Sequence, residues 1–368
     1  MFLPSRTHHL GRRMIVSNAS SWTAAAVRYS ENGDPEKVLE LTEESVSGDL
    51  GEGNVALKLL AAPVNPADIN TIQGVYGIKP PLPATPGGEG LAEVLDVGTH
   101  VRNVQKGDRV IFSAPMLGTW RTYTTASATQ VLKISKEIPL IAGATITINP
   151  PTAFRMLYDF VGLRKNDVIV QNAANSAVGQ AVIQIAAANN WRTVNIIRDR
   201  PNKADTVQFL SSLGATHVIT DADFKRKEVL QSLPKAQLGL NAVSGKAVAD
   251  MVKLMNDRST LVTYGGMSKQ PLLIPTTALI FKDIICCGFW VSRWNDENST
   301  EERIEMLDSL TSLIKDGKLK PPQVEPVLLK DFKQAIQRSQ EGFSNRKQLL
   351  VMDEQIMTTV QQEIEANR

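Results

Sequence analysis

The sequence predicts an α/β protein in which a β-rich domain precedes a doubly wound parallel sheet. Short apolar strands with frequent Gly and Pro run from about residue 24 to 149, and strands then alternate with helix-like segments from residue 152 onward. The chain ends with further short strands and a helix. Strand–helix alternation favours a parallel sheet covered by helices. The length of 368 residues suggests roughly two domains.

The β-rich region contains three clear strand signals. Val55–Ala62 is an apolar run that ends at Pro63, and Gly90–Gly98 is a second run with a glycine exit. Residues Lys106–Ile111 combine a turn with the start of a strand. These short pieces predict a compact, largely antiparallel, barrel-like domain.

The alternating region contains β-branched and apolar strand segments separated by helical patterns. The first strand, Val168–Val170, is the kind of run that is buried in a parallel sheet. We expect further strands within residues 193–200, 214–220, 239–243 and 259–266, helices within residues 152–161, 247–255 and 300–315, and a helix in the Ala-rich run after Gly179.

The first thirty residues have the composition of a targeting segment. They contain four arginines, several Ser and Thr residues and no acidic residue. This pattern is typical of mitochondrial transit peptides, so we expect residues 1–22 to direct the protein to the mitochondrial matrix. A disordered basic tail without a targeting role is the alternative.

Bulk composition excludes several classes of partner. The chain is 42% hydrophobic and 21% charged, with a formal net charge of +2, which indicates neither nucleic acid nor a membrane surface as a partner. No apolar run approaches the roughly 18 residues of a membrane-spanning helix. The two cysteines, Cys286 and Cys287, are adjacent. We therefore expect neither a disulfide nor a structural zinc site, and a reducing compartment.

The most informative segment is Asp167–Arg200. It has the pattern of a strand, a tight turn of small and amide residues, a helix and a second strand, which places a helix N-terminus against a pyrophosphate. Only Gly179 of the three fingerprint glycines is present, and Asn172 and Ala177 stand where glycines are commoner. From this motif alone, a dinucleotide site and an ordinary α/β crossover are about equally good interpretations.

The end of the second strand bears on which dinucleotide would bind. Asp199 follows Gly179 by about 20 positions, where a ribose-binding acid is expected. Arg198 and Arg200 flank it and would form a fork for a 2′-phosphate, which a lone aspartate would repel. This pattern favours NADPH over NADH, and a solvated charged loop is the alternative.

Seven motifs carry a resemblance to one family. The order of a β-rich domain, a Rossmann domain and a carboxy-terminal return resembles the medium-chain dehydrogenase/reductase superfamily. From about residue 22 to 352 the chain is similar to the mitochondrial trans-2-enoyl-thioester reductases of that superfamily. It departs from the family at Ala177, where glycine is common, and in the tail after Met352. The motifs are Val64–Asn70, Gln73–Gly77, Pro86–Gly90, Gln171–Gln184, Arg198–Pro201, Tyr264–Met267 and Gly288–Trp290.

The resemblance implies a division of the chain into domains. A GroES-like catalytic domain would comprise residues 23–150 and be completed by residues 296–352. A Rossmann domain for NADPH would comprise residues 151–295. Residues 353–368 are polar and are expected to form a frayed helical tail.

The resemblance also implies an activity and a proton donor. Reduction of a double bond conjugated to a thioester places a hydride on the β-carbon and negative charge on the enolate oxygen, so the α-carbon needs a proton. The resemblance assigns this role to Tyr76, because a phenol with a pKa near 10 is protonated at neutral pH. Gly74 and Gly77 permit the turn that aims its ring inward. Without the resemblance, a surface tyrosine in a turn would be the preferred interpretation.

No metal is expected in this site. The alcohol dehydrogenases of the superfamily use zinc held by Cys and His, and this chain has too few cysteines for either of their zinc sites. His100 and His217 have no suitable partners in the motifs. Hydrogen-bond donors would therefore stabilise the developing charge.

The expected NADPH-binding residues lie in six segments. Asn149 precedes two prolines and is expected in extended backbone with its amide toward the nicotinamide, or alternatively as a cap of the next helix. Lys347 resembles a family residue that reaches back to the cofactor, although a lone lysine is usually solvated. The full set is Asn149, Asn175, Ser176, Ala177, Val178, Arg198, Asp199, Arg200, Tyr264, Gly265, Gly266, Met267, Phe289, Trp290, Val291 and Lys347.

The resemblance thus implies an oxidoreductase that acts on a CH–CH bond. It would reduce trans-2-enoyl thioesters to saturated acyl thioesters with NADPH, as the last step of the mitochondrial fatty acid elongation cycle. The acyl group would be carried on acyl carrier protein or coenzyme A, and the enzyme would be a homodimer. The alternatives are an NADPH-dependent quinone or alkenal reductase of the same superfamily and a non-catalytic cofactor-binding paralogue.

Overall fold

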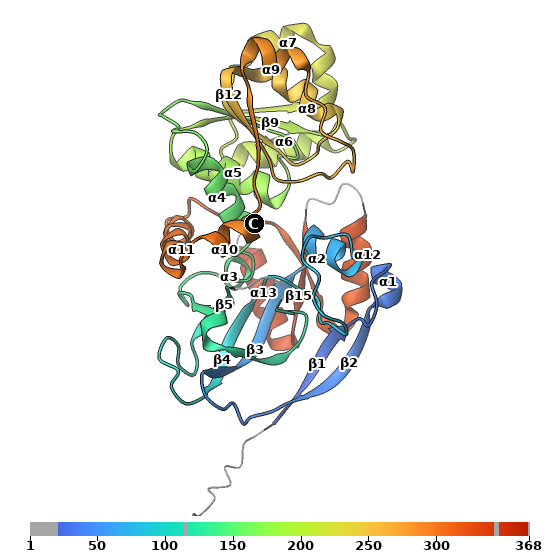
Figure 1. Ribbon diagram of the computed structural model, residues 1–368, viewed down its shortest axis with the longest axis vertical. Helices are drawn as coiled ribbons and strands as arrows, with labels where there is room; N and C mark the ends of the chain where they lie inside the picture. The colour runs from blue at the N-terminus through green and yellow to red at the C-terminus, as the bar shows by residue number, and fades with distance from the viewer. Residues whose placement is uncertain (1–20, 114–116, 342–345, 367–368) are drawn as a thin grey trace, which may run out of the picture.

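The computed structural model describes residues 21–113, 117–341 and 346–366, and it contains two large sheets (Figure 1). A six-stranded sheet and its helices occupy the upper half of Figure 1, and a seven-stranded sheet lies in the lower half. This arrangement confirms the predicted α/β fold class. The predicted transit peptide lies almost wholly outside the described residues.

The seven-stranded sheet takes strands from both ends of the chain. Its order is β14-β15-β3-β4-β5-β7, and β6 pairs with β3. Strand β15 lies antiparallel to β3 and parallel to β14, so the last strand of the chain completes the first domain. A separate hairpin-like pair consists of β1 and β2. The bounds are β1 (Trp22–Arg28), β2 (Glu40–Val46), β3 (Asn54–Pro63), β4 (Leu91–Val97), β5 (Arg109–Phe112), β6 (Tyr123–Ser127), β7 (Val131–Lys133), β14 (Val324–Leu328) and β15 (Lys347–Val351).

The six-stranded sheet is parallel throughout, in the order β10-β9-β8-β11-β12-β13. The chain winds outward from β8 through β9 to β10 and then returns to the other side of β8 at β11. In open parallel sheets of this kind, ligands bind beyond the carboxyl ends of the strands at the point where the direction of winding reverses. The bounds are β8 (Val168–Gln171), β9 (Arg192–Ile197), β10 (His217–Thr220), β11 (Ala236–Asn241), β12 (Met255–Thr263) and β13 (Ile285–Gly288).

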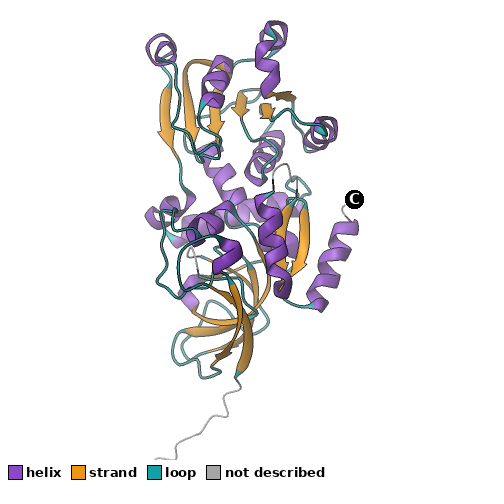
Figure 2. Ribbon diagram, turned by 90° about the vertical axis from the view of Figure 1, so that its right-hand side faces the viewer, coloured by secondary structure: helices purple, strands orange, loops and turns teal. Residues whose placement is uncertain are grey.

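Helices cover the parallel sheet and link it to the β-rich domain (Figures 1 and 2). The helix predicted at residues 300–315 is confirmed with those bounds. The helices are α1 (Pro35–Val38), α2 (Pro66–Ile72), α3 (Leu140–Ala144), α4 (Asn149–Tyr158), α5 (Ala177–Ala188), α6 (Lys203–Ser212), α7 (Lys227–Ser232), α8 (Lys246–Met251), α9 (Thr276–Lys282), α10 (Val291–Glu297), α11 (Thr300–Lys315), α12 (Phe332–Gln340) and α13 (Glu354–Ala366).

Two expectations about helices are wrong. Asn149 is the first residue of α4 rather than an extended residue ahead of it. The two prolines that follow fit the first turn, where an amide hydrogen has no partner in the helix and a φ near −65° is already helical. Residue Ile148 takes the capping position.

The carboxy-terminal residues form a packed helix instead of a frayed tail. Helix α13, which ends near the label C in Figure 2, buries Val360 completely. Ile356 and Ile364 lie one turn to either side and pack against the same core. The Glu363 carboxylate accepts hydrogen bonds from the amides of Leu140 and Ile141, at 2.6 and 3.0 Å, at the start of α3. Helix α13 therefore packs against α3, the helix that precedes α4.

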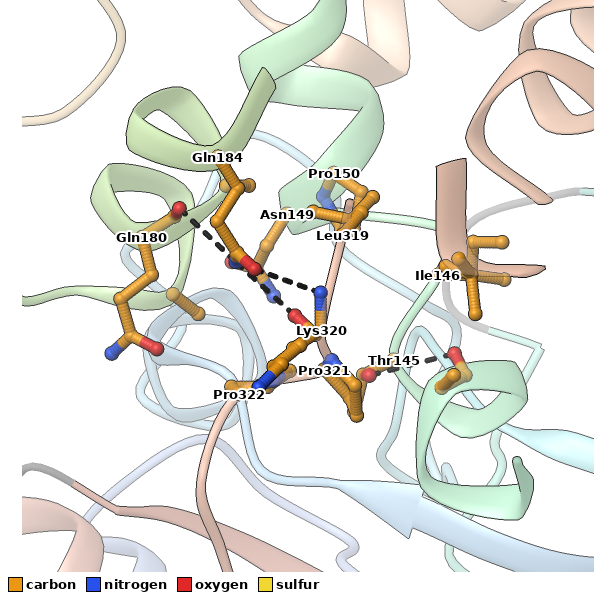
Figure 3. Close-up of a pocket in the computed structure, with 14 residues that line it drawn as sticks. Thr145, Ile146, Asn149, Pro150, Gln180, Gln184, Leu319, Lys320, Pro321 and Pro322 are labelled. Atoms are coloured by element: carbon orange, nitrogen blue, oxygen red, sulfur yellow. Dashed lines mark hydrogen bonds between the residues drawn. The ribbon is translucent and has the colours of Figure 1, made fainter. Parts of the chain in front are cut away.

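The two halves of the molecule are joined by a pair of hydrogen bonds from a buried glutamine. Gln184 on α5 accepts from the Lys320 amide at 2.8 Å and donates to the Lys320 carbonyl at 3.2 Å (Figure 3). Lys320 lies in the link between α11 and β14, so this pair ties the helix behind the first parallel strand to the β-rich sheet. In the described part of the chain, no helix is both long and apolar enough to cross a membrane.

Candidate active site

The loop that carries Tyr76 is fixed to the end of α2. The amides of Val75 and Tyr76 both donate to the Asn70 carbonyl, at 3.0 and 3.2 Å. Gly74 has a φ of 74°, a conformation in which a side chain would be strained, and a Cβ there would lie 3.0 Å from the Asn32 side chain. Gly77 does not have a positive φ, so only the first of the two glycines is required by the turn.

The Tyr76 side chain meets Trp290 from the other half of the chain. The indole Nε1 of Trp290 donates to the Tyr76 hydroxyl oxygen at 2.9 Å, and the two rings are perpendicular with centroids 6.0 Å apart. A Cβ on Gly77 would lie 3.5 Å from the Trp290 ring, so the loop is close to it. Because the indole occupies an acceptor position on the phenol oxygen, the phenol hydrogen is left to point elsewhere.

The surroundings of Tyr76 keep it protonated at neutral pH. Burial raises the pKa of Tyr76, and the negative charge of Asp68 acts in the same direction. Hydrogen bonds from Trp290 and Ser292 act in the opposite direction, because donors stabilise a phenolate. The phenol is therefore an acid, and Trp290 and Ser292 would stabilise the phenolate that forms when it gives up its proton.

A buried polar network lies at the junction of α2, α4 and β15. The Lys347 ammonium donates to the side-chain oxygen of Asn65 at 2.6 Å, and the Asn149 amide donates to the same oxygen at 3.4 Å. The Asn65 amide nitrogen donates to Glu89 at 3.0 Å. Asn65 and Glu89 are 2% and 1% exposed, so this network is shielded from water. It joins two residues that the sequence predicts as cofactor contacts.

Glu89 and Asp68 are the carboxyl groups of this network. Glu89 also accepts from the amides of Thr147 and Ile148, each at 2.9 Å, immediately before Asn149. Asp68 accepts from the amides of Asn65 and Gly88, at 2.8 and 3.0 Å. Burial raises the pKa of Asp68 to about 7 and also raises the pKa of Glu89.

Desolvation lowers the pKa of Lys347, and the charges of Glu89 and Asp68 oppose that effect. Sequence reasoning did not select Asn65, Asp68 or Glu89 as site residues. All three residues lie within the motifs Val64–Asn70 and Pro86–Gly90, so the family resemblance was the signal that could have identified them.

The turn after β8 has the form expected of a phosphate-binding turn. Ser176 caps α5, with its hydroxyl accepting from the Gly179 amide at 3.1 Å, and Ala177 and Val178 begin the helix. A Cβ on Gly179 would lie 2.5 Å from the Ala174 carbonyl oxygen, so the single retained glycine is needed for packing. The carbonyl of Asn175 accepts from the Gln180 side chain at 2.8 Å.

Asn172, which stands where a glycine is commoner, has a structural role that the sequence did not reveal. Its side chain donates to Asn241 at 2.8 Å and accepts from the Ala242 amide at 2.8 Å. The Asn241 oxygen also accepts from the amides of Val243 and Ser244. The two asparagines therefore connect the turn after β8 to the turn after β11.

The segment Tyr264–Met267 follows β12 and closes over these turns. Burial raises the pKa of Tyr264 well above its ordinary value, and the neighbouring Ser176 side chain acts in the opposite direction. A Cβ on Gly265 would lie 3.1 Å from the Ala242 carbonyl oxygen, and one on Gly266 would lie 3.7 Å from Ser244. Met267 is 64% exposed at the end of the segment.

The charged residues after β9 lie beyond the carboxyl end of that strand. Arg198 is exposed and Arg200 is buried, and the nearby charge of Arg198 adds to desolvation in lowering the pKa of Arg200. Asp199 forms an ion pair with Lys203 at 2.8 Å. The Asp199 carboxylate, which would otherwise repel a phosphate, is therefore paired with the Lys203 ammonium.

The aromatic segment after β13 connects the parallel sheet with the Tyr76 loop. The Phe289 amide donates to the Thr263 carbonyl at 3.0 Å, and its ring packs edge-on against Phe160 with centroids 6.0 Å apart. Trp290 caps α10 and Val291 begins it. The structure thus pairs Tyr76 with Trp290 and joins Asn149 and Lys347 through the shared Asn65 oxygen.

Comparison with known proteins identifies both halves of the molecule. Residues 51–136 match the alcohol dehydrogenase GroES-like domain, and residues 177–309 match the zinc-binding dehydrogenase family model. Among the described residues, no three His, Cys, Asp or Glu side chains are grouped as a metal site would require.

Several relatives match almost the whole chain. The mitochondrial enoyl-[acyl-carrier-protein] reductase of Xenopus tropicalis is 42% identical over 93% of this chain and 99% of its own length. The structure of the mitochondrial 2-enoyl thioester reductase Etr1p/Etr2p heterodimer from Candida tropicalis is 34% identical over 90% of this chain and 100% of that chain, with a TM-score of 0.83. The Etr1p complex with NADP and crotonyl-CoA matches with the same identity and coverage and a TM-score of 0.84.

The fold and the site define an oxidoreductase of the medium-chain dehydrogenase/reductase superfamily. The GroES-like and nucleotide-binding parts meet at Tyr76 and Trp290. The chain belongs to the mitochondrial enoyl-[acyl-carrier-protein] reductase family.

Proposed function

We propose that the protein reduces the 2,3 double bond of trans-2-enoyl thioesters with NADPH and releases saturated acyl thioesters, the last step of each elongation cycle in mitochondrial fatty acid synthesis. The observation that carries this proposal is the Tyr76 phenol, which is placed at the junction of the two halves with its oxygen bonded to Trp290 at 2.9 Å. The relatives named enoyl-[acyl-carrier-protein] reductase and the Etr1p complex with NADP and crotonyl-CoA support the same reaction.

The cofactor site of this chain fits a phosphorylated dinucleotide. A capped helix N-terminus at Ser176 is suited to a pyrophosphate, and Gly265 and Gly266 keep the opposing backbone free of side chains. The exposed Arg198, next to an aspartate that is paired with Lys203, would bind the 2′-phosphate. When bound, NADPH supplies the hydride. Asn149 and Lys347 would orient the nicotinamide end of NADPH. Phe289, Trp290 and Val291 would line the wall of that part of the site.

Tyr76 would complete the reduction by protonating the substrate. Once the β-carbon has gained hydride, the enolate electrons form a C–H bond at the α-carbon with the proton of the phenol. The electron pair of the broken O–H bond stays on the phenolate oxygen. Donors from Trp290 and Ser292 stabilise that oxygen, and solvent then restores its proton.

The carrier of the acyl group would approach from the side of α10. Arg293 is exposed, and its guanidinium lies 5.9 Å from the centroid of the Trp290 ring. A cation at this position suits the phosphate of phosphopantetheine, which acyl carrier protein and coenzyme A share. Either carrier would therefore present its thioester to Tyr76.

The assembly we propose is a homodimer that extends the parallel sheet. Strand β13 is the edge of that sheet, and Ile285 on it is 58% exposed. Ile280 and Phe281 of the preceding helix are 65% and 75% exposed. Unpaired apolar edges of this kind are usually covered by another chain. The Etr1p/Etr2p structure is a heterodimer of two such reductases.

The relatives are mitochondrial proteins by name, which agrees with a mitochondrial location. Within the organelle we propose the matrix, supported by the arginine-rich, acid-free composition of the first thirty residues. Import of a fluorescent fusion of residues 1–30 would test this, with the four arginines changed to glutamine as the control.

The function is tested by comparing electron acceptors. Purified protein with NADPH should reduce crotonyl-CoA and longer trans-2-enoyl thioesters at much higher kcat/KM than quinones or alkenals. Equal or better rates with quinones would favour the related quinone reductases. No turnover with any enoyl thioester, despite tight NADPH binding, would indicate a non-catalytic paralogue.

A further inference from the structure

The strongest unassigned feature is the buried amide of Asn65, which connects four segments of the chain. Its partners are Glu89, Asn149 and Lys347, which lie 24, 84 and 282 positions away in the sequence. The backbone N–H of Asn65 donates to the Asp68 carboxyl at 2.8 Å, which fixes the backbone at the start of α2. The side chain is therefore held by partners on all sides and cannot move independently of them.

The orientation of the Asn65 amide follows from the chemistry of Glu89. An ionised carboxylate has no hydrogen to donate, so the NH₂ group of Asn65 must face it. The carbonyl oxygen of Asn65 must then face the opposite side, where both the Lys347 ammonium and the Asn149 amide need an acceptor. Glu89 and Lys347 thus fix the same orientation of the amide from its two sides, and the charge of Glu89 opposes the lowering of the Lys347 pKa by burial.

Glu89 fixes Asn149 by a second route. Its other oxygen accepts from the amides of Thr147 and Ile148 and from the Thr147 hydroxyl, at 2.9, 2.9 and 3.2 Å. These residues immediately precede α4, whose first residue is Asn149. The backbone and the side chain of Asn149 are therefore both set by one carboxylate, directly and through Asn65.

We propose that Asn65, oriented by Glu89, is a positioning residue that holds Lys347 and Asn149 in the geometry that receives the nicotinamide end of NADPH. This inference rests on the proposed function for the identity of the cofactor. Neither Asn65 nor Glu89 touches the reacting atoms. Loss of either side chain should therefore weaken NADPH binding more than it slows the proton transfer from Tyr76.

The test measures NADPH binding directly, by the change in its fluorescence, together with KM and kcat for crotonyl-CoA reduction. Asn65→Ala and Glu89→Gln should each raise Kd and KM for NADPH by about 10- to 100-fold, because each leaves a buried charged or polar partner unsatisfied. The control is Asn54→Ala, whose side chain bonds only the Leu50 carbonyl, and this variant should keep the wild-type KM.

A double-mutant cycle separates positioning from loss of fold. In a Lys347→Ala background, Asn65→Ala should cost only about two- to threefold more in KM, since its main partner is already gone. Full additivity of the two effects would overturn the proposal. So would a folded Asn65→Ala or Glu89→Gln variant with NADPH binding within about twofold of wild type.

A pH profile gives an independent readout for Glu89→Gln. Asp68 from α2 and Glu89 from the segment before β4 are the acidic groups that face Lys347. Without Glu89, the affinity for NADPH should begin to fall at a lower pH as Lys347 loses its proton; an unchanged profile would count against the proposal. Because NADPH binding is measured without substrate, these results stand apart from whether enoyl thioesters prove to be the substrate.

Discussion

At the residue scale, the chemistry depends on one phenol, and its removal gives the simplest prediction. Tyr76→Phe should lower kcat for crotonyl-CoA by about 10²- to 10⁴-fold, the usual contribution of a general acid, with little change in Kd for NADPH. The rate of NADPH oxidation and a binding titration measure the two effects. Tyr158→Phe, an exposed tyrosine on α4 bonded to Asn189, is the matched control and should behave as wild type. Near-normal turnover of Tyr76→Phe would remove the acid role.

Cofactor choice should depend on Arg198. Arg198→Ala should raise KM for NADPH by about tenfold or more and leave KM for NADH nearly unchanged, because only NADPH carries the 2′-phosphate. Steady-state rates with each cofactor measure this. Arg226→Ala, which removes an exposed arginine paired with Asp223, should change neither constant. Equal increases in KM for NADPH and NADH would show that Arg198 does not bind the 2′-phosphate.

Asp68 gives a prediction about stability and pH. Burial raises its pKa from 3.8 to about 7, so between these values the folded protein holds a proton that the unfolded chain releases. The stabilising contribution of this group is present at low pH and is lost as the pH rises through 7. The melting temperature of wild type should therefore fall by a few degrees more than that of Asp68→Asn between pH 5 and 8. Parallel curves for the two proteins would contradict the assignment.

At the scale of elements, helix α13 is predicted to stabilise the catalytic domain. Val360→Ala should lower the free energy of unfolding by about 2 kcal/mol, because the side chain is fully buried against the core. Thr358→Ala, on the exposed side of the same helix, should change it by less than about 0.5 kcal/mol. Urea unfolding measures both, and equal effects would show that the helix does not pack as described.

The elements also show which features the sequence could predict. Helix α11 was located correctly because its signals are local: Ser299 and Glu302 form a capping box, and the periodicity continues to Lys315. Helix α13 was mistaken for a frayed tail because the partners that make it stable lie at Leu140 and Ile141, more than two hundred positions away. Local pattern cannot report such contacts.

The same limit applies to the site. Motifs near Tyr76, Ser176 and Trp290 could be recognised because each is contiguous. The Asn65 network could not, since Asn65 and its three side-chain partners meet only in the folded chain. Asn149 was expected in extended backbone because it precedes a proline, yet the first turn of a helix tolerates that sequence.

At the scale of the whole molecule, the exposed edge of the parallel sheet predicts a dimer. Wild type should have about twice the mass of one chain by light scattering, and Phe281→Glu or Ile280→Glu should yield monomers, because a buried unpaired charge is costly at an interface. Leu41→Glu, an exposed apolar position on β2, should leave the dimer intact. A monomeric wild type would exclude this assembly.

The pairing of β15 with β3 has a consequence for the order in which the molecule is made. Leu349 to Val351 lie beside residues 61–63, so β3 pairs with β4 and β6 early but gains β15 only after residue 351 has been synthesised. Lys347 joins Asn65 in the same final step. The nucleotide-binding half, whose strands all lie between residues 168 and 288, has no such dependence on the end of the chain. The half that is synthesised first is therefore the half that can finish folding last, because its sheet gains β15 only after all strands of the other half have been made.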